Sequence, residues 1–171
     1  VGHRVPRVDR EIHNDLLDRI KLYKTMGPEP LDGITQKHFN DNLSRRANSR
    51  IKPVILDQQI IAGVGNIYAD ESLWMSEIHP STRVKDIPES SRTLLLESII
   101  DSMKTSIAHG GSTNRNYVDA KGQKGSYMKF AKVFRREGQD CFRCGNEIIK
   151  IKLAGRGTHY CPVCQKSEGV A

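Results

Sequence analysis

Apolar residues recur at helical spacing through the first two thirds of the chain, between turns marked by glycine and proline. The prolines within residues 27–30 stop the first of these patterns, because proline cannot continue a helix. Thr35 is a good N-cap for the second, and Pro53 suits the first turn of the third. The predicted helices are 14–26, 35–47, 54–58, 66–76 and 89–109.

The helix expected at 89–109 is the longest and carries an apolar stripe. Its apolar side chains recur every four residues, with two more alongside, so they share one face. The stripe comprises Leu95, Leu96, Ile99, Ile100, Met103 and Ile107. This pattern is typical of core packing rather than of a cofactor site.

The character of the sequence changes after this helix. Residues 110–127 are polar and rich in glycine, and they are longer than most connections inside a domain, which indicates a functional or mobile loop. Residues 128–136 are predicted to form one strand. A hairpin is then expected from Ile149, Ile151 and Leu153 alternating with lysines, a turn at 155–157, and a strand at 158–160. The fold class is therefore α+β, with a helical unit before a small β unit.

Positive charge is concentrated in the C-terminal third. Lysine and arginine number 27 against 20 acids, for a net charge of +7 and a pI near 9.3. Residues 1–103 hold 14 basic and 15 acidic side chains, whereas residues 104–166 hold 13 basic and 4 acidic ones. Such an excess favours a polyanionic partner.

Membrane and export signals are missing from the sequence. No run approaches the roughly 18 to 20 apolar residues of a membrane span, and the first residues have no apolar signal-peptide core. The chain is therefore expected to be soluble and intracellular, without a membrane partner. Its start at Val1 suggests a fragment or a processed chain.

All four cysteines fall in two C-x2-C pairs separated by sixteen residues: Cys141, Cys144, Cys161 and Cys164. This spacing predicts a tetrahedral zinc site, and four thiolates leave no open position for water, so the ion is structural. Disulfides and redox pairs are the alternatives; the first is disfavoured without an export signal, and the second because both pairs flank a hairpin. His159 is expected to serve the strand rather than the metal.

The stretch Gly63-Val64-Gly65-Asn66 opens a predicted helix. Glycines permit close approach of another molecule, helix-initial N–H groups favour anions, and Asn66 adds an amide donor, so a phosphate is the expected ligand. Asp70 and Glu71 are expected to suit the helix dipole. The alternative for the glycines is an ordinary tight turn.

Arg156 stands between two glycines in the most basic region, at the expected tip of the hairpin. Its guanidinium is free to bind a phosphate through two hydrogen bonds. The alternative is an ordinary exposed turn residue.

Together these motifs closely resemble the C-terminal half of bacterial formamidopyrimidine-DNA glycosylase. The matching segments are "MGPEPLD" at 26–32, "IKPVILDQ" at 51–58, "AGVGNIYADESLW" at 62–74, "IHP" at 78–80, "GGSTNRNYVDAKGQKG" at 110–125 and the cysteine pairs with "GRGTHYCPVCQ". The resemblance implies a linker at 1–25, an all-α helix-two-turns-helix domain at 26–127 with a lid loop at 110–127, and a β-hairpin zinc finger at 128–171.

The resemblance also implies roles for individual residues. Asn66 and Arg156 would bind phosphates around an extruded base, and Arg156 would also take part in the elimination step. The loop would read the damaged purine. The implied DNA-binding residues are Asn48, Lys52, Gly65, Asn66 and Arg156, and the implied lesion-recognition residues are Ser112, Thr113, Arg115 and Tyr117.

The sequence departs from the family pattern at four places. Asn116 stands where the family usually has aspartate, Met128 where it commonly has an aromatic residue, and Asn48 where a lysine often contacts DNA. The family's N-terminal proline nucleophile and the glutamate after it are absent from the opening Val1-Gly2-His3. The isolated chain is therefore expected to bind DNA without glycosylase chemistry, and whether it acts as an enzyme is left open.

The predicted function is the damaged-DNA-binding portion of a base-excision-repair DNA glycosylase and AP lyase acting on 8-oxoguanine and formamidopyrimidine. Its partner would be double-stranded DNA with damaged bases or abasic sites, its cofactor one zinc ion, and its location the bacterial cytoplasm at the nucleoid, as a monomer. Two alternatives stay open: a non-enzymatic zinc module for nucleic acids, and a fragment of an endonuclease VIII-like glycosylase for oxidised pyrimidines.

Overall fold

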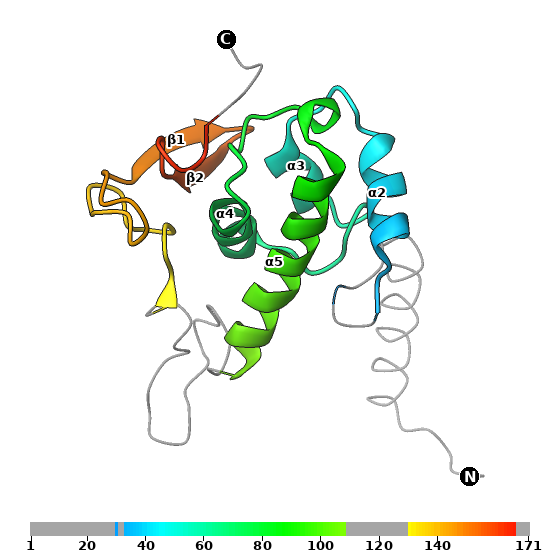
Figure 1. Cartoon of the computed structure of the whole chain (residues 1–171), viewed down its shortest axis with the longest axis horizontal. Coiled ribbons are helices and arrows are strands. Elements are labelled where there is room, and N and C mark those ends of the chain that lie inside the picture. The colour runs from blue at the N-terminus through cyan, green and yellow to red at the C-terminus, as the bar shows by residue number, and fades with distance from the viewer. Residues whose placement is uncertain (1–29, 31–32, 109–129, 167–171) are drawn as a thin grey trace, which may run out of the picture.

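The computed structural model describes residues 30, 33–108 and 130–166, in which a helical unit lies beside a β-hairpin unit (Figure 1). The linker 1–25, the helix expected at 14–26 and the loop 110–127 fall outside the described residues. The elements are α2 Gln36–Ser44, α3 Ile51–Leu56, α4 Asn66–Met75, the short 3-10 helix η2 Val84–Asp86, α5 Glu89–Ala108, β1 Ile149–Leu153 and β2 Arg156–Tyr160.

The predicted helices are confirmed for α2, α4 and α5 within the described residues. The hydroxyl of Thr35 caps α2 by accepting the backbone N–H of His38 at 3.1 Å. The prediction for α3 was displaced, because this helix begins at Ile51, not at residue 54. Carbonyls of the segment after α4 accept the first N–H groups of α3, which satisfies them without a capping side chain.

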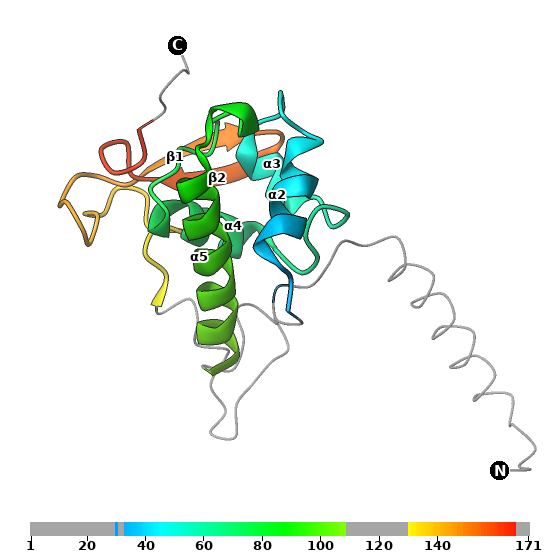
Figure 2. The same cartoon turned by 45° about the vertical axis from the view of Figure 1, so that its right-hand side comes forward.

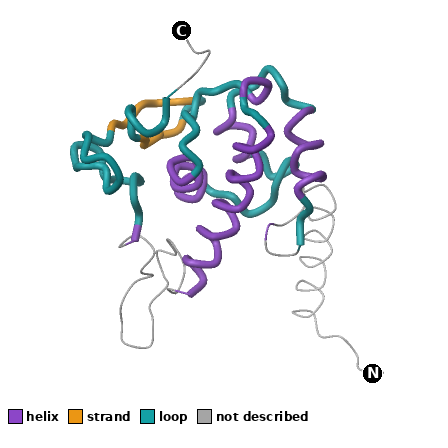
Figure 3. The backbone as a smooth tube through the Cα atoms, viewed as in Figure 1, coloured by secondary structure: helices purple, strands orange, loops and turns teal. Residues whose placement is uncertain are grey.

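Helix α4 lies at the centre of the molecule, in contact with α3, α5 and β2 (Figures 2 and 3). One core surrounds it on the helical side, and its largest fully buried members are Phe39, Leu43, Ile51, Ile55, Ile61, Leu73, Leu95 and Ile99. A smaller cluster of Trp74, Val133, Cys141, Ile148 and Cys161 joins α4 to the cysteine loops. Among the described helices, none has the length and apolarity to cross a membrane.

The apolar stripe of α5 is core at its start but not at its end. Leu95 and Ile99 are fully buried, whereas Ile107 is 65 % exposed, so its prediction as a core residue was wrong. The last turns of α5 extend past the other helices of Figure 1. There the buried residue is Ser106, whose hydroxyl hydrogen-bonds to that of Tyr68 at 2.6 Å.

Strands β1 and β2 form an antiparallel hairpin in which Leu153 pairs with Arg156. The pair Ala154–Gly155 makes the turn, with φ values of 50° and 78° that are typical of a two-residue hairpin connection. The turn was therefore predicted too late in the sequence, at 155–157, because it lies at 154–155. Arg156 is not the tip of the hairpin but the first residue of β2, where the ladder constrains its backbone.

The strand predicted at 128–136 is absent from its described part, residues 130–136. The backbone N–H groups of Lys132, Val133 and Phe134 instead converge on the Glu71 carboxylate, with distances of 2.8 and 3.1 Å for the last two. A strand would point successive N–H groups in opposite directions, whereas this turn directs all three to one anion. Burial raises the pKa of Glu71, and the three donors oppose that shift.

We expect Glu71→Gln to destabilise the protein by about 2–4 kcal/mol, because a neutral amide presents one acceptor and a clashing N–H to three backbone donors, two of them buried. Urea denaturation monitored by circular dichroism measures this change. The matched control is Glu77→Gln on an exposed carboxylate, with an expected cost below about 0.5 kcal/mol. Equal stability of the two variants would show that the Glu71 charge is not needed to hold residues 132–134.

Candidate nucleic-acid interface and metal centre

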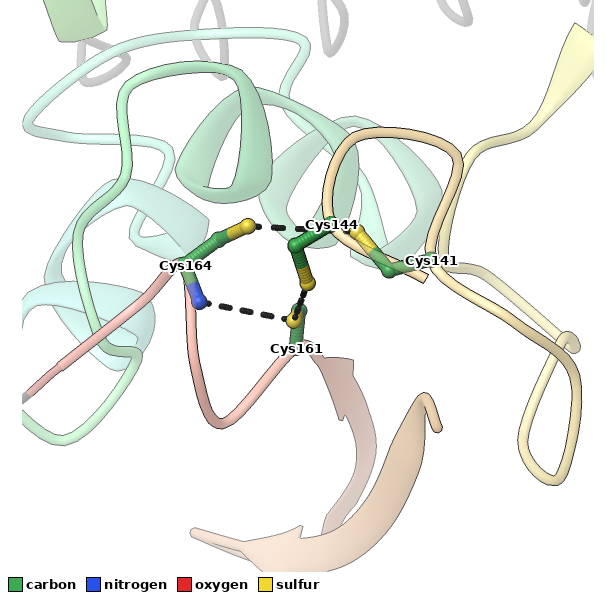
Figure 4. A group of neighbouring side chains, drawn as sticks. All are labelled: Cys141, Cys144, Cys161 and Cys164. Carbon is green, nitrogen blue, oxygen red and sulfur yellow. Dashed lines mark hydrogen bonds between the residues drawn. The ribbon is translucent and has the colours of Figure 1, made fainter. Parts of the chain in front are cut away.

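The four cysteines converge between two loops, one before β1 and one directly after β2, with their sulfur atoms facing one another (Figure 4). All four Sγ atoms lie within 4.8 Å of one another. The Sγ atoms of Cys141 and Cys164 are 3.9 Å apart, and those of Cys144 and Cys161 are 3.4 Å apart. A zinc–sulfur bond of about 2.3 Å gives a tetrahedron with sulfur–sulfur edges of about 3.8 Å. The donor set therefore fits one zinc ion.

Neighbouring N–H groups donate hydrogen bonds to these sulfur atoms, which favours the thiolate form that binds a metal. The indole N–H of Trp74 donates to Cys141 at 3.3 Å, and Nε of Arg143 donates to Cys164 at 3.3 Å. Hydrogen bonds from Asn146 lower the pKa of the Cys144 thiol to about 6, whereas burial raises the pKa of Cys164 to about 12. Zinc binding requires all four thiols to lose their protons, which makes metal affinity dependent on pH.

The disulfide alternative to a metal site does not match the structure. The cysteines form no disulfide, and the ligand group contains no residue other than the four. His159 lies in β2 with its ring between two carboxylates, at 2.9 Å from Asp70 and 3.2 Å from Glu137. The expectation that His159 serves the strand and not the metal is confirmed.

The two positions before α4 that hold glycine, Gly63 and Gly65, differ in whether the backbone conformation favours glycine there. Gly63 has φ of +86°, which favours glycine for conformational reasons alone. Gly65 is the N-cap of α4, with φ of −92° and ψ of −179°, values that any residue adopts. A Cβ built on Gly65 meets no atom within 4 Å, and no side chain caps the helix. Nothing in the described fold therefore demands glycine at position 65.

Asn66, at the first position of α4, reaches the hairpin. Its Nδ2 donates to the backbone carbonyl of Gly157 at 3.1 Å. The ammonium of Lys52, in α3, donates to the same carbonyl at 3.0 Å. Gly157 directly follows Arg156 in β2, so the structure brings Asn66, Lys52 and Arg156 together from three elements.

Lys52 is part of this group but faces inward, which corrects its prediction as a DNA contact. Its side chain is 1 % exposed, and its ammonium has three partners, the Gly157 carbonyl, the Thr158 hydroxyl at 2.8 Å and the Asp70 carboxylate at 2.7 Å. An ammonium has three protons, so none is left for a phosphate. Burial lowers the pKa of Lys52, the Asp70 carboxylate opposes that shift, and the charge of Arg156 adds to it.

Arg156 faces outward. Its residue is exposed, and among the described residues its guanidinium makes no ion pair or hydrogen bond. It borders a depression of about 220 Å³ between α3 and the hairpin turn. The lining residues are Lys52, Pro53, Leu56, Asp57, Leu153, Ala154 and Arg156. An exposed guanidinium beside a shallow surface depression can bind an anionic group of a ligand that approaches from solvent.

The remaining predicted site residues lie elsewhere. Asn48 is exposed in the segment between α2 and α3, where its backbone carbonyl accepts a hydrogen bond from the Arg83 guanidinium at 3.2 Å. Among the described residues, no hydrogen bond joins Asn48 to Asn66 or Arg156. The lesion-recognition residues Ser112, Thr113, Arg115 and Tyr117 fall outside the described residues, as do Asn116 and Met128.

Two site residues were misjudged from the sequence. Asp70 and Glu71 are 0 % and 2 % exposed, and neither lies in the first turn of α4, so the helix dipole does not explain them. Each binds the β unit, Asp70 through His159 and Glu71 through residues 132–134. The sequence did carry a signal for this burial, because the two adjacent acids stand among the apolar residues Ile67, Ala69, Leu73 and Trp74 of the same helix.

Comparison with known families identifies both units. Residues 26–118 match the model of the formamidopyrimidine-DNA glycosylase H2TH domain, where H2TH abbreviates helix-two-turns-helix. Residues 138–166 match a zinc finger found in formamidopyrimidine-DNA glycosylase and isoleucyl-tRNA synthetase. The first match alone covers more than half of the chain.

Individual relatives agree. The chain is 41 % identical to a formamidopyrimidine-DNA glycosylase of Pelotomaculum thermopropionicum, over 91 % of this chain and 56 % of that protein. It is 46 % identical to that of Lactococcus lactis subsp. cremoris, over 85 % of this chain and 53 % of that protein. A Lactococcus lactis Fpg bound to abasic-site DNA superposes with a TM-score of 0.78 at 44 % identity, over 90 % of this chain and 56 % of that one. The chain thus spans about half the length of these relatives.

Proposed function

Because this chain belongs to the formamidopyrimidine-DNA glycosylase family, we propose that it is the damaged-DNA-binding C-terminal portion of a base-excision-repair glycosylase and AP lyase. Solved relatives are complexes with abasic-site DNA and with DNA containing Fapy-dG. Oxidised purines are the proposed lesions, and the bacterial nucleoid is the proposed location. The proposed domains are 26–127 and 128–171, which contain the matched segments 26–118 and 138–166.

One observation carries the proposed mode of binding: the Asn66 amide donates to the carbonyl of Gly157, the residue that directly follows Arg156 in β2. Asn66 uses one of its two Nδ2 protons on that carbonyl, and Arg156 has its guanidinium in solvent. We propose that the start of α4 and the start of β2 bind neighbouring phosphates of one DNA strand. Extrusion of a base from the duplex costs a few kcal/mol. Contacts to the DNA phosphates hold the duplex in register during this step.

The position of Gly65 supports this mode. The backbone N–H groups of the first turn of α4 have no side-chain cap, and helix starts favour anions. A phosphate that approaches these groups needs the space that a Cβ at position 65 would occupy. Close approach of DNA is therefore the proposed reason for glycine where the fold itself accepts other residues.

We expect Gly65→Ala to separate binding from stability. Alanine is compatible with the local backbone and restricts the unfolded chain, which offsets its poorer N-cap preference, so stability should change by no more than about 1 kcal/mol. DNA affinity should fall by about tenfold or more, because the methyl group blocks the phosphate. Thermal melting and fluorescence anisotropy with a labelled duplex measure the two effects. Undiminished affinity in a stable variant would remove the helix start from the interface.

Two further parts of the proposal concern the whole protein. Arg156 is the proposed participant in the elimination step that follows base removal, and the loop at 110–127 is the proposed reader of the extruded purine. Lys52 is assigned a supporting role within the interface, in place of direct contact with DNA. Asn48 is proposed as a weaker phosphate contact, because an exposed amide carries no charge.

Binding to a panel of nucleic acids tests the proposed function. The zinc-loaded chain would be titrated with DNA duplexes that contain 8-oxoguanine, thymine glycol, a tetrahydrofuran abasic analogue or no lesion, and with duplex RNA. We expect the abasic and 8-oxoguanine duplexes to bind most tightly. Preference for thymine glycol would favour a pyrimidine-directed endonuclease VIII-like protein. Equal binding to every duplex, RNA included, would favour a non-enzymatic module.

A further inference from the structure

A cluster of buried charges joins the two units next to the proposed phosphate contacts. Lys52, Asp70 and His159 are 1 %, 0 % and 3 % exposed and come from α3, α4 and β2. Asp70 Oδ1 lies 2.7 Å from the Lys52 ammonium, and Asp70 Oδ2 lies 2.9 Å from Nδ1 of His159. The Glu137 carboxylate, 44 % exposed, lies at 3.2 Å on the outer side of the histidine ring.

The cluster holds the three residues that follow Arg156. Lys52 donates to the Gly157 carbonyl at 3.0 Å and to the Thr158 hydroxyl at 2.8 Å. Asp70 accepts the backbone N–H of His159 at 3.0 Å. The Thr158 hydroxyl in turn donates to the carbonyl of Arg156 at 3.2 Å. Gly157, Thr158 and His159 are thus each hydrogen-bonded to Lys52 or Asp70 of the helical unit, and Arg156 is linked to them through the Thr158 hydroxyl.

The same cluster also contacts α4, the helix that carries Asn66, the other proposed phosphate contact. Asp70 belongs to α4, which begins at Asn66, and Asn66 shares the Gly157 carbonyl with Lys52. A change in the position of Asp70 would therefore move the start of β2 relative to the start of α4. Asp70 therefore constrains the distance between the two proposed phosphate contacts, together with the direct hydrogen bond from Asn66 to Gly157.

Stability alone does not account for such a cluster. Removing ions from water is costly, and replacing a buried ion pair with apolar groups often leaves stability unchanged or raises it. An ion pair with directed hydrogen bonds does, however, fix one arrangement of the groups that it joins. The Lys52–Asp70 ion pair therefore contributes mainly by fixing the relative positions of α3, α4 and β2. Such a constraint suits a binding site whose two halves come from different units.

We propose that Asp70 is a positioning residue for DNA binding, which acts through Lys52 and the backbone of residues 157–159 to hold the Arg156 guanidinium at a set distance from Asn66. The proposal rests on the proposed function, because it assigns Arg156 a phosphate.

The test is the combined change Lys52→Met with Asp70→Asn, measured in the zinc-loaded chain with and without Arg156→Ala. Removing both charges avoids leaving one of them buried and unpaired. We expect zinc content and helical circular dichroism to be retained, and affinity for the tetrahydrofuran duplex to fall about tenfold. The loss caused by Arg156→Ala should shrink from about tenfold in the unaltered chain to about twofold or less, since a misplaced guanidinium contributes little.

The matched control is Lys37→Met with Asp41→Asn, which makes the same two replacements in an exposed pair on α2. In that background the loss caused by Arg156→Ala should stay at about tenfold. The same undiminished loss in the Lys52 and Asp70 background would contradict the proposal. No effect of Arg156→Ala in the unaltered chain would instead overturn the proposed function.

Thr158→Val provides a second test that keeps both charges and does not depend on the folding of the double variant. It removes only the hydroxyl that links Lys52 to the Arg156 carbonyl. We expect the effect of Arg156→Ala on affinity to shrink in this background too. Full retention of the Arg156→Ala effect in a zinc-loaded Thr158→Val chain would contradict the proposal.

Discussion

Chelation of zinc is expected to unfold residues 137–166 while most of the helical structure remains. The apolar cluster that joins this region to α4 contains only five buried residues, and two of them, Cys141 and Cys161, are themselves ligands. So small a β unit cannot hold itself together without its metal. Zinc binding is worth about 10–16 kcal/mol in isolated fingers, which is as large as the whole stability of a typical domain. The helices have a separate core and should persist.

Two-dimensional NMR of the chain with and without chelator measures this effect. The amide signals of β1 and β2 should collapse to random-coil positions, and zinc, but not magnesium, should restore them. Loss of the hairpin also uncovers Trp74, so tryptophan fluorescence should report the same transition. Well-dispersed signals from β1 and β2 in fully metal-free protein would show that the hairpin does not depend on zinc.

Arg156→Ala is expected to weaken binding to every DNA duplex by about tenfold and to lower the salt dependence of binding by about one ion. The guanidinium has no partner among the described residues, so its removal leaves no buried group unsatisfied and stability should not change. Arg156→Lys should recover part of the affinity, because lysine keeps the charge and loses the bidentate geometry.

Titrations at several salt concentrations measure both the affinity and the slope. Lys37→Ala is the control, since it also removes one positive charge but lies in α2, paired with Asp41. It should leave the slope unchanged. If both variants weaken binding equally, the effect of Arg156 is a matter of net charge and not of a phosphate contact.

Much of the fold could be predicted because its signals are local. The C-x2-C pairs, the alternation of Ile149, Ile151 and Leu153 with lysines, and the Thr35 cap each act within a few residues. Asn66 hydrogen-bonds to Gly157, the residue after Arg156, so the structure places the two motifs next to each other. The resemblance to a known family supplied that pairing, because residues 66 and 156 are too far apart in sequence for a local pattern to join them.

The errors in prediction have tertiary causes. Residues 130–136 have strand-like composition, but the Glu71 carboxylate collects three of their N–H groups into a turn. Lys52 belongs to a basic cluster in the sequence, yet Asp70 and the hairpin bring it inside. A charged residue is normally assigned to the surface, and only the partner from another element shows otherwise. Both cases depend on α4, which carries the two buried acids.

We propose that the start of α4 and Arg156 bind the same DNA strand from two sides. A crystal structure of the zinc-loaded chain with a duplex that contains a tetrahydrofuran abasic analogue tests it most directly. We predict that the Asn66 amide and the Arg156 guanidinium contact neighbouring phosphates of the strand that carries the analogue. A complex in which these two side chains contact different strands, or in which either points away from the DNA, would contradict the account.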